Sequence, residues 1–168
     1  MSAVPRLPPR AVMVNERRVN APLQYPPMAV LKILFFCIGN TCRSPMAEAI
    51  ARGLGGGSVR AASAGLRPFG RIVGGTEHAL ARLGYDARGL ASKGFDAVDL
   101  EDFDIIVSLL GDAGLAYLPS GLGVDVEAWP IADPYGEDDE VYLATARTLE
   151  KRIRNLLDDR AVRELPII

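Results

Sequence analysis

The alternation of apolar and polar positions divides the chain from residue 30 onward into strands and helices. Apolar or strand-like runs predict four strands, at residues 30–36, 59–65, 104–110 and 124–129. Helical spacing predicts three helices, at residues 44–54, 75–84 and 140–158, and a weaker one at 91–103. Local signals make Ser44 the cap of the first helix and Thr76 the cap of the second, with Gly84 just beyond its end.

Strands that alternate with helices predict a mostly parallel sheet covered on both faces. The expected fold class is therefore α/β, and the 168 residues suit a single domain. We place this domain at residues 30–168. In such sheets ligands bind beyond the carboxyl ends of the strands, which is where the segment after the first strand lies.

Residues 1–29 differ from the rest of the chain in composition. They hold half of the twelve prolines, four arginines and one glutamate, and they show no apolar periodicity. This composition predicts a flexible Pro/Arg-rich tail. Translation that starts at Met28, just before the first strand, is the alternative interpretation.

Charge and cysteine usage exclude several classes of protein. A net charge of −2 gives no reason to expect a nucleic acid or a membrane surface as partner. The two cysteines lie five positions apart, which excludes a disulfide framework and favours a reducing, cytoplasmic compartment. With His78 they make a poor zinc set, so we expect no metal and no cofactor. The apolar segment 28–38 resembles a secretory segment, but it is too short to span a bilayer, Lys32 interrupts it, and it fits a buried strand better.

The candidate chemistry lies in the connection CIGNTCRS, which joins the first strand to the first helix. Gly39 and Asn40 tolerate positive φ, so the loop can turn its N–H groups toward an anion. Arg43 adds a planar fork suited to two oxygens of a tetrahedral oxyanion. Cys37 at the base would attack phosphorus as a thiolate and form a cysteinyl-phosphate. The expected phosphate-binding residues are Ile38, Gly39, Asn40, Thr41, Cys42 and Ser44, of which Ser44 also reaches the sulfur.

Attack by a thiolate requires a general acid to protonate the leaving group. The segment ADPYGED follows the fourth strand, so it lies at the same edge of the sheet. Asp133 is the predicted acid, Pro134 stiffens its loop, and Tyr135 forms a wall of the pocket. His78 lies inside a predicted helix and is the weaker candidate.

These residues closely resemble the low-molecular-weight protein tyrosine phosphatase family. The resemblance runs from about residue 31 to residue 157 and rests on CIGNTCRSPMAEA and DPYG, with SAG and DIIVSL in support. It implies a phosphotyrosine protein phosphatase I-like fold, a single three-layer domain whose four-stranded parallel sheet is flanked by helices. It also implies a metal-free two-step hydrolysis with Cys37 as nucleophile, Arg43 as phosphate clamp and Asp133 as acid and base. Asn40 and Ser44 would order the loop, and Cys42 would protect Cys37 through a reversible disulfide. The family often has a histidine near residues 89–90 that supports the loop, and this chain has none there.

The identity of the substrate stays open between two interpretations. Thr41 and Gly136 resemble the protein-arginine phosphatase branch of the family, which favours phosphoarginine, whereas the family as a whole implies phosphotyrosine. The partners would be phosphorylated proteins, and the chain would be a monomer or a weak dimer. An arsenate reductase of the same fold is an alternative, although no cysteine follows Cys42 to pass oxidation along. A phosphocysteine carrier module and a binding module with a dead site are less compatible with Cys37, Arg43 and Asp133 together.

Overall fold

The computed structural model describes residues 29–163 of the chain. Its strands are β1 (Leu31–Cys37), β2 (Val59–Gly65), β3 (Ile105–Ser108) and β4 (Asp125–Ala128). Its α-helices are α1 (Arg43–Gly55), α2 (Gly74–Leu83) and α3 (Asp139–Arg163). The predicted tail lies outside the described residues except for residue 29, so the division into tail and domain stays a prediction.

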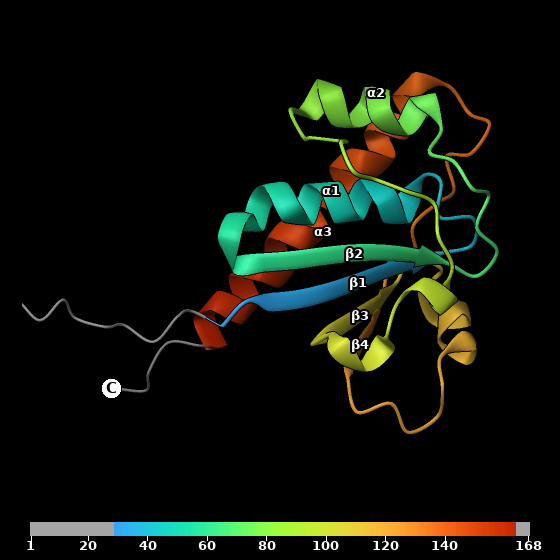
Figure 1. Ribbon diagram of the computed structural model, residues 1–168. Coiled ribbons are helices and arrows are strands. Elements are labelled where there is room, and N and C mark those ends of the chain that lie inside the picture. The colour runs from blue at the N-terminus through green and yellow to red at the C-terminus, as the bar shows by residue number, and fades with distance from the viewer. Residues whose placement is uncertain (1–28, 164–168) are drawn as a thin grey trace, which may run out of the picture.

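The four strands form one parallel sheet in the order β2-β1-β3-β4. Helices α1 and α3 lie on one face, and α2 packs against these two helices on the side away from the sheet (Figure 1). The opposite face is covered by short 3₁₀ turns and loops. The predicted α/β domain with a four-stranded parallel sheet is confirmed, and its parallel strands bring all four carboxyl ends to one edge.

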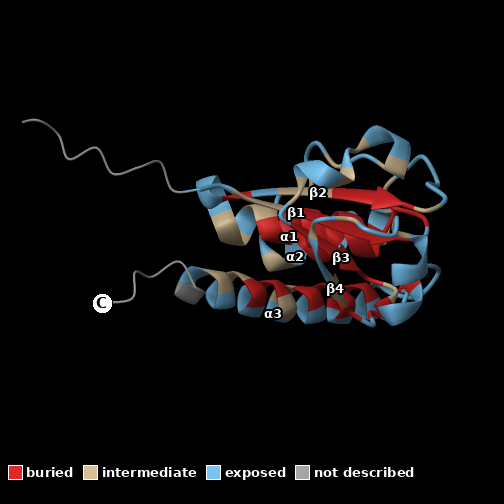
Figure 2. Ribbon diagram, turned by 90° about the horizontal axis from the view of Figure 1, so that it is seen from below, coloured by how far each residue is buried: buried red, intermediate tan, exposed pale blue. Residues whose placement is uncertain are grey.

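The apolar run of β1 is continuous because both faces of this strand are buried. Ile33 and Phe35 point into the core beneath the helices, while Leu34 and Phe36 point into a second, smaller core on the opposite face. Figure 2 shows β1 and most of α1 buried, whereas α3 is buried only along one side. The strand that carries the candidate nucleophile at its end is therefore fixed from both sides.

The prediction of a weak helix at residues 91–103 is wrong. This segment forms two 3₁₀ turns, Phe95–Ala97 and Leu100–Asp102, with extended backbone between them. Its spacing still has a physical cause, because four of its side chains pack against the smaller core: Phe95, Val98, Leu100 and Phe103. Helical spacing and a pair of tight turns place apolar residues at similar intervals, so the pattern alone did not separate them.

Two predicted helix caps are also wrong. Helix α1 begins at Arg43 after Cys42, and α2 begins after Val73, and neither preceding residue makes a side-chain cap. Thr76 lies inside α2, where its hydroxyl donates to the carbonyl of Thr41. The Ser44 hydroxyl is likewise directed into the loop. Both hydroxyls therefore form hydrogen bonds with residues outside their own helix instead of capping its first turn. Gly84 does end α2, with a left-handed φ of 80°.

Within residues 29–163, no helix is both long enough and apolar enough to cross a bilayer.

Candidate active site

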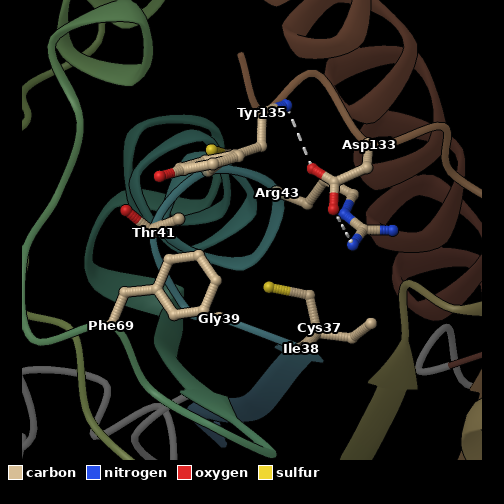
Figure 3. Close-up of a pocket in the computed structure, with 9 residues that line it drawn as sticks. Cys37, Ile38, Gly39, Thr41, Arg43, Phe69, Asp133 and Tyr135 are labelled. Atoms are coloured by element: carbon tan, nitrogen blue, oxygen red, sulfur yellow. Dashed lines mark hydrogen bonds and ion pairs between the residues drawn. The ribbon is translucent and has the colours of Figure 1, made fainter.

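Three loops at the carboxyl edge of the sheet enclose one cavity of about 220 Å³. They are the connection from β1 to α1, the segment that follows β2, and the segment that follows β4 (Figure 3). The cavity is lined by Cys37, Ile38, Gly39, Thr41, Cys42, Arg43, Phe69, Asp133 and Tyr135. All but Phe69 are among the residues that the sequence singled out.

The first loop turns its carbonyl groups outward. The carbonyls of Cys37, Ile38 and Gly39 accept from N–H groups of residues 66, 67 and 69 at 2.8–3.1 Å. Within the described residues, the N–H groups of 38–41 make no such bond, so they remain available to an anion. Asn40 is the one residue other than glycine that has a positive φ in the described part of the chain, at 47°. The predicted sharp turn at Gly39 and Asn40 is thus present.

Cys37 lies at the base of the cavity, as Figure 3 shows. Its Sγ is 3.0 Å from the hydroxyl of Ser44, which also accepts from the side-chain amide of Asn40 at 2.9 Å. The sulfur therefore borders the cavity that also contains the guanidinium, rather than being directed into the apolar interior. A hydroxyl at this distance can donate to a thiolate and stabilise it.

Arg43 connects the first loop to the segment after β4. One terminal nitrogen donates to Asp133 Oδ2 at 2.6 Å and the other to the carbonyl of Ile131 at 3.1 Å. Its Nε is buried and has no acceptor among the described residues. A buried donor without an acceptor is costly unless a ligand satisfies it, so this group indicates an anion site.

Asp133 stands at the mouth of the cavity, with its side chain 48% exposed. Its second oxygen accepts from the N–H of Tyr135 at 3.1 Å, which fixes the carboxylate in the short loop. The ring of Tyr135 meets that of Phe69 edge to face, with centroids 5.4 Å apart. The two rings form an apolar wall that a planar group can contact.

Phe69 and Ile131 were missed by the sequence analysis. Phe69 follows β2 in the stretch RPFG, so the rule that ligands gather at the carboxyl ends of strands already pointed to its position. Ile131 contributes only its backbone carbonyl, which accepts a hydrogen bond from Arg43, and no sequence pattern predicts a backbone contact of this kind.

Thr41 donates its hydroxyl proton to the carbonyl of Arg71 at 2.6 Å. The hydroxyl therefore has no proton to offer a substrate, although its oxygen can still accept a hydrogen bond. Toward a substrate, the Thr41 hydroxyl can therefore serve only as a hydrogen-bond acceptor.

Cys42 is a buried free thiol within 3.7 Å of the Tyr142 hydroxyl. Burial raises the pKa of the Cys42 thiol, because the charged form would lose its hydration. Burial also raises the pKa of Tyr142, to about 12, with the hydrogen bond to Cys42 contributing. Both cysteines are free in the structure, so the disulfide between Cys37 and Cys42 stays a prediction.

His78 lies on the exposed side of α2, with its Nδ1 3.6 Å from Asp139, and it does not line the cavity. In the part of the chain that the structure describes, no three His, Cys, Asp or Glu side chains gather to hold a metal ion.

Comparisons with known proteins identify the family of this chain. The family model described as low molecular weight phosphotyrosine protein phosphatase matches residues 32–165. The glutaredoxin arsenate reductase of Synechocystis sp. is 31% identical over 127 residues, which cover 75% of this chain and 95% of that protein. The low molecular weight protein-tyrosine-phosphatase YfkJ of Bacillus subtilis is 39% identical over 90 residues, which cover 48% of this chain and 56% of that protein.

Solved structures show the same fold. A structure described as an arsenate reductase in the phosphate binding state superposes with a TM-score of 0.70 at 29% identity, covering 77% of this chain and 98% of that one. The match of the family model covers most of the chain, including all three loops of the cavity. This chain is a member of the low molecular weight phosphotyrosine protein phosphatase family.

Proposed function

We propose that this chain is a protein phosphatase that removes the phosphoryl group from tyrosine or arginine side chains through a cysteinyl-phosphate. The observation that carries the proposal is the convergence of Cys37, Arg43 and Asp133 on one cavity. These residues supply a nucleophile, an oxyanion clamp and a proton donor, which are the groups that phosphoryl transfer without a metal requires.

In the first step, the Cys37 thiolate attacks phosphorus in line with the leaving group. The S–P bond forms as the bond to oxygen or nitrogen breaks, and Asp133 gives its proton to the departing atom. The loop N–H groups and Arg43 hold the phosphoryl oxygens. In the second step, Asp133 takes a proton from water, which attacks phosphorus and releases phosphate with the thiolate restored.

The ion pair between Arg43 and Asp133 has to open during this cycle. The terminal nitrogen that holds Asp133 at 2.6 Å is also one of the donors that a phosphoryl group would use. When a dianionic phosphoryl group takes that nitrogen, the carboxylate loses its cationic partner beside a new negative charge. The carboxyl group is thereby released from Arg43 and can act on the departing atom.

The walls of the cavity favour a planar leaving group. Phe69 and Tyr135 are both about half exposed at the mouth, where Ile38 adds a third apolar surface. A phenyl ring and a guanidinium group can each stack against an aromatic face, so these walls are compatible with both phosphotyrosine and phosphoarginine.

Thr41 provides a test between these two substrates. Its oxygen can accept an N–H from the guanidinium of phosphoarginine, and phosphotyrosine has no such donor. We therefore expect Thr41→Ile to raise the ratio of kcat/KM on phosphotyrosine to kcat/KM on phosphoarginine by about tenfold, the value of one lost hydrogen bond. The measurement is phosphate release from matched peptides. Thr41→Ser keeps the hydroxyl and should leave the ratio unchanged, and an unaltered ratio in Thr41→Ile would remove Thr41 as a specificity residue.

Arsenate reduction is the second candidate, because relatives named as arsenate reductases match this chain across most of its length. Arsenate is a tetrahedral oxyanion that the same loop would bind. Its reduction needs two electrons from thiols, and the two cysteines of this sequence both lie in the loop. An external thiol such as glutathione would then have to restore them.

One set of assays separates the candidates. The protein is given p-nitrophenyl phosphate, a phosphotyrosine peptide and a phosphoarginine peptide in the presence of a metal chelator, and separately arsenate with glutathione, glutaredoxin, glutathione reductase and NADPH. We expect metal-independent phosphate release from at least one peptide, with no NADPH oxidation that depends on arsenate. Arsenate-dependent oxidation without phosphatase activity would replace the proposed function by the second candidate.

A further inference from the structure

The loop that follows β2 carries two arginines that have no part in the proposed chemistry. Arg67 and Arg71 stand two residues before and two residues after Phe69, which lines the cavity. Both arginines are exposed. Within the described residues, neither guanidinium forms an ion pair with a carboxylate. Two positive charges beside the cavity are therefore available to a ligand.

Hydrogen bonds hold both arginines beside residues of the cavity wall. The N–H of Arg67 donates to the carbonyl of Ile38 at 2.8 Å. The carbonyl of Arg71 accepts from the Thr41 hydroxyl at 2.6 Å. Ile38 and Thr41 both line the cavity, so the backbone of each arginine lies one hydrogen bond away from the wall. Both arginines therefore lie at the mouth of the cavity, on the same side as Phe69.

Charges of opposite sign are segregated on the two sides of this mouth. Residues 49–76 include four arginines and no acidic residue. Residues 133–140 include five carboxylates, two of which lie beside basic side chains of α2, and no lysine or arginine. Figure 3 shows Phe69 and Asp133 on opposite sides of the Cys37 sulfur. The mouth of the cavity therefore has a basic side and an acidic side.

We propose that Arg67 and Arg71 bind acidic side chains that flank the phosphorylated residue of a protein substrate. A carboxylate within a few residues of the phosphoryl group can pair with either guanidinium. A carboxylate on the other flank would meet the like charges of residues 133–140, which disfavours it. The preferred substrate is therefore a segment that is acidic on one side of the phosphorylated residue and neutral or basic on the other. This inference rests on the proposed function, because it requires a phosphorylated side chain to enter the cavity.

The expected effect is modest, because both arginines are exposed to water. An exposed ion pair changes an equilibrium by about two- to threefold, so a substrate that forms both pairs gains about fivefold. Dissolved salt screens such pairs, so the gain should shrink as ionic strength rises. The phosphoryl group itself is held by the loop N–H groups and Arg43, so the chemical step should not depend on the two arginines.

The test compares three peptides of equal length on the full-length chain, each prepared with phosphotyrosine and with phosphoarginine. One has aspartates before the phosphorylated residue and lysines after it, one has the reverse order, and one has neutral flanks. Both charged orders are needed, because a peptide could lie across the mouth in either direction. We expect kcat/KM for one charged order to exceed that of the neutral peptide by about fivefold, and kcat/KM for the other to fall below it. Equal values for all three peptides would overturn the proposal.

Substitution of the two arginines assigns the preference to them. Arg67→Gln with Arg71→Gln should bring the favoured and neutral peptides to equal kcat/KM, mainly through a higher KM for the favoured peptide, because only flanking contacts are lost. Arg67→Lys with Arg71→Lys keeps both charges and should retain most of the preference, whereas Arg67→Glu with Arg71→Glu should favour the opposite charge order. Arg60→Gln is the matched control, since Arg60 is exposed near the amino end of β2, at the edge of the sheet away from the cavity. A preference that survives Arg67→Gln with Arg71→Gln would overturn the assignment.

Binding to Cys37→Ser separates this proposal from the proposed function. Fluorescence anisotropy of the labelled peptides gives a Kd for each charge order without hydrolysis, and the favoured order should bind about fivefold more tightly than the neutral peptide. Hydrolysis and binding that ignore the charge order would refute this proposal and leave the proposed function standing. Binding that follows the charge order and is weakened by Arg67→Gln with Arg71→Gln, in a chain that hydrolyses no peptide, would support this proposal and refute the proposed function. Failure to bind any of the peptides would refute both.

Discussion

Cys37→Ser is expected to abolish hydrolysis of p-nitrophenyl phosphate, with a fall in kcat of about 10⁴-fold or more. A serine hydroxyl is almost wholly protonated under conditions in which a thiol supplies a useful fraction of thiolate. The loop is also shaped to stabilise an anion on the larger sulfur atom, so it would not stabilise an oxygen anion in the same place. Binding should survive, because the N–H groups of the loop and Arg43 do not depend on the sulfur. Steady-state release of p-nitrophenolate and binding of inorganic phosphate by calorimetry measure the two effects.

Cys42→Ser is the comparison within the same loop. The Cys42 thiol is hydrogen-bonded to Tyr142 rather than to Ser44, and its raised pKa keeps it protonated near neutral pH. We expect this variant to keep about a tenth or more of the wild-type rate, since it removes no group that forms or breaks a bond. Hydrolysis that persisted in Cys37→Ser at the wild-type rate would show that phosphoryl transfer takes place without a cysteinyl-phosphate.

The parts of the site that could be predicted are those encoded by neighbouring residues. The turn at Gly39 and Asn40, the N–H donors and the candidate nucleophile Cys37 all lie within the seven positions from Cys37 to Arg43, between a strand and a helix. Local geometry therefore nearly determines the loop. The location of Asp133 near this loop could be predicted from the topology, because parallel strands place the end of β4 at the same edge of the sheet as the end of β1. The structure brings these residues to one cavity, as both patterns imply.

The parts that could not be predicted depend on side chains that meet across the fold. From its position in the sequence, the Ser44 hydroxyl could either cap α1 or form a hydrogen bond to the Cys37 sulfur. The sequence alone does not decide between these two roles, and the structure shows the second. Glu48 looks like an ordinary polar position of a helix, and only the packing of α1 against β2 shows that it is buried against Ser63. A buried carboxylate carries no signature in a single sequence, because its partners are set by tertiary contacts.

Asp133→Asn is expected to slow the first chemical step, and to slow it more for a substrate with a poor leaving group than for one with a good leaving group. For phenyl phosphate, whose phenolate needs a proton as it departs, the rate of cysteinyl-phosphate formation should fall by about 10²- to 10³-fold. For p-nitrophenyl phosphate, whose leaving group departs as a stable anion, the same rate should fall by less than about tenfold. The substitution keeps the size of the side chain, so the loop that Tyr135 and Arg43 hold should stay in place.

The first step has to be observed directly, because Asp133 is also the proposed base that activates water in the second step. Steady-state turnover of both esters would therefore fall together, whereas the initial burst of phenol or p-nitrophenolate reports only the formation of the S–P bond. Asp138→Asn is the control, since Asp138 lies five residues further on and caps the first turn of α3, a task that asparagine performs equally well. Equal burst rates for the two esters in Asp133→Asn, each lowered by the same factor, would mean that the proton comes from another group. The dissociation constant of each ester should not rise in this variant, because a neutral amide oxygen competes less strongly than the carboxylate with the phosphoryl oxygens for the Arg43 nitrogen that Asp133 holds at 2.6 Å.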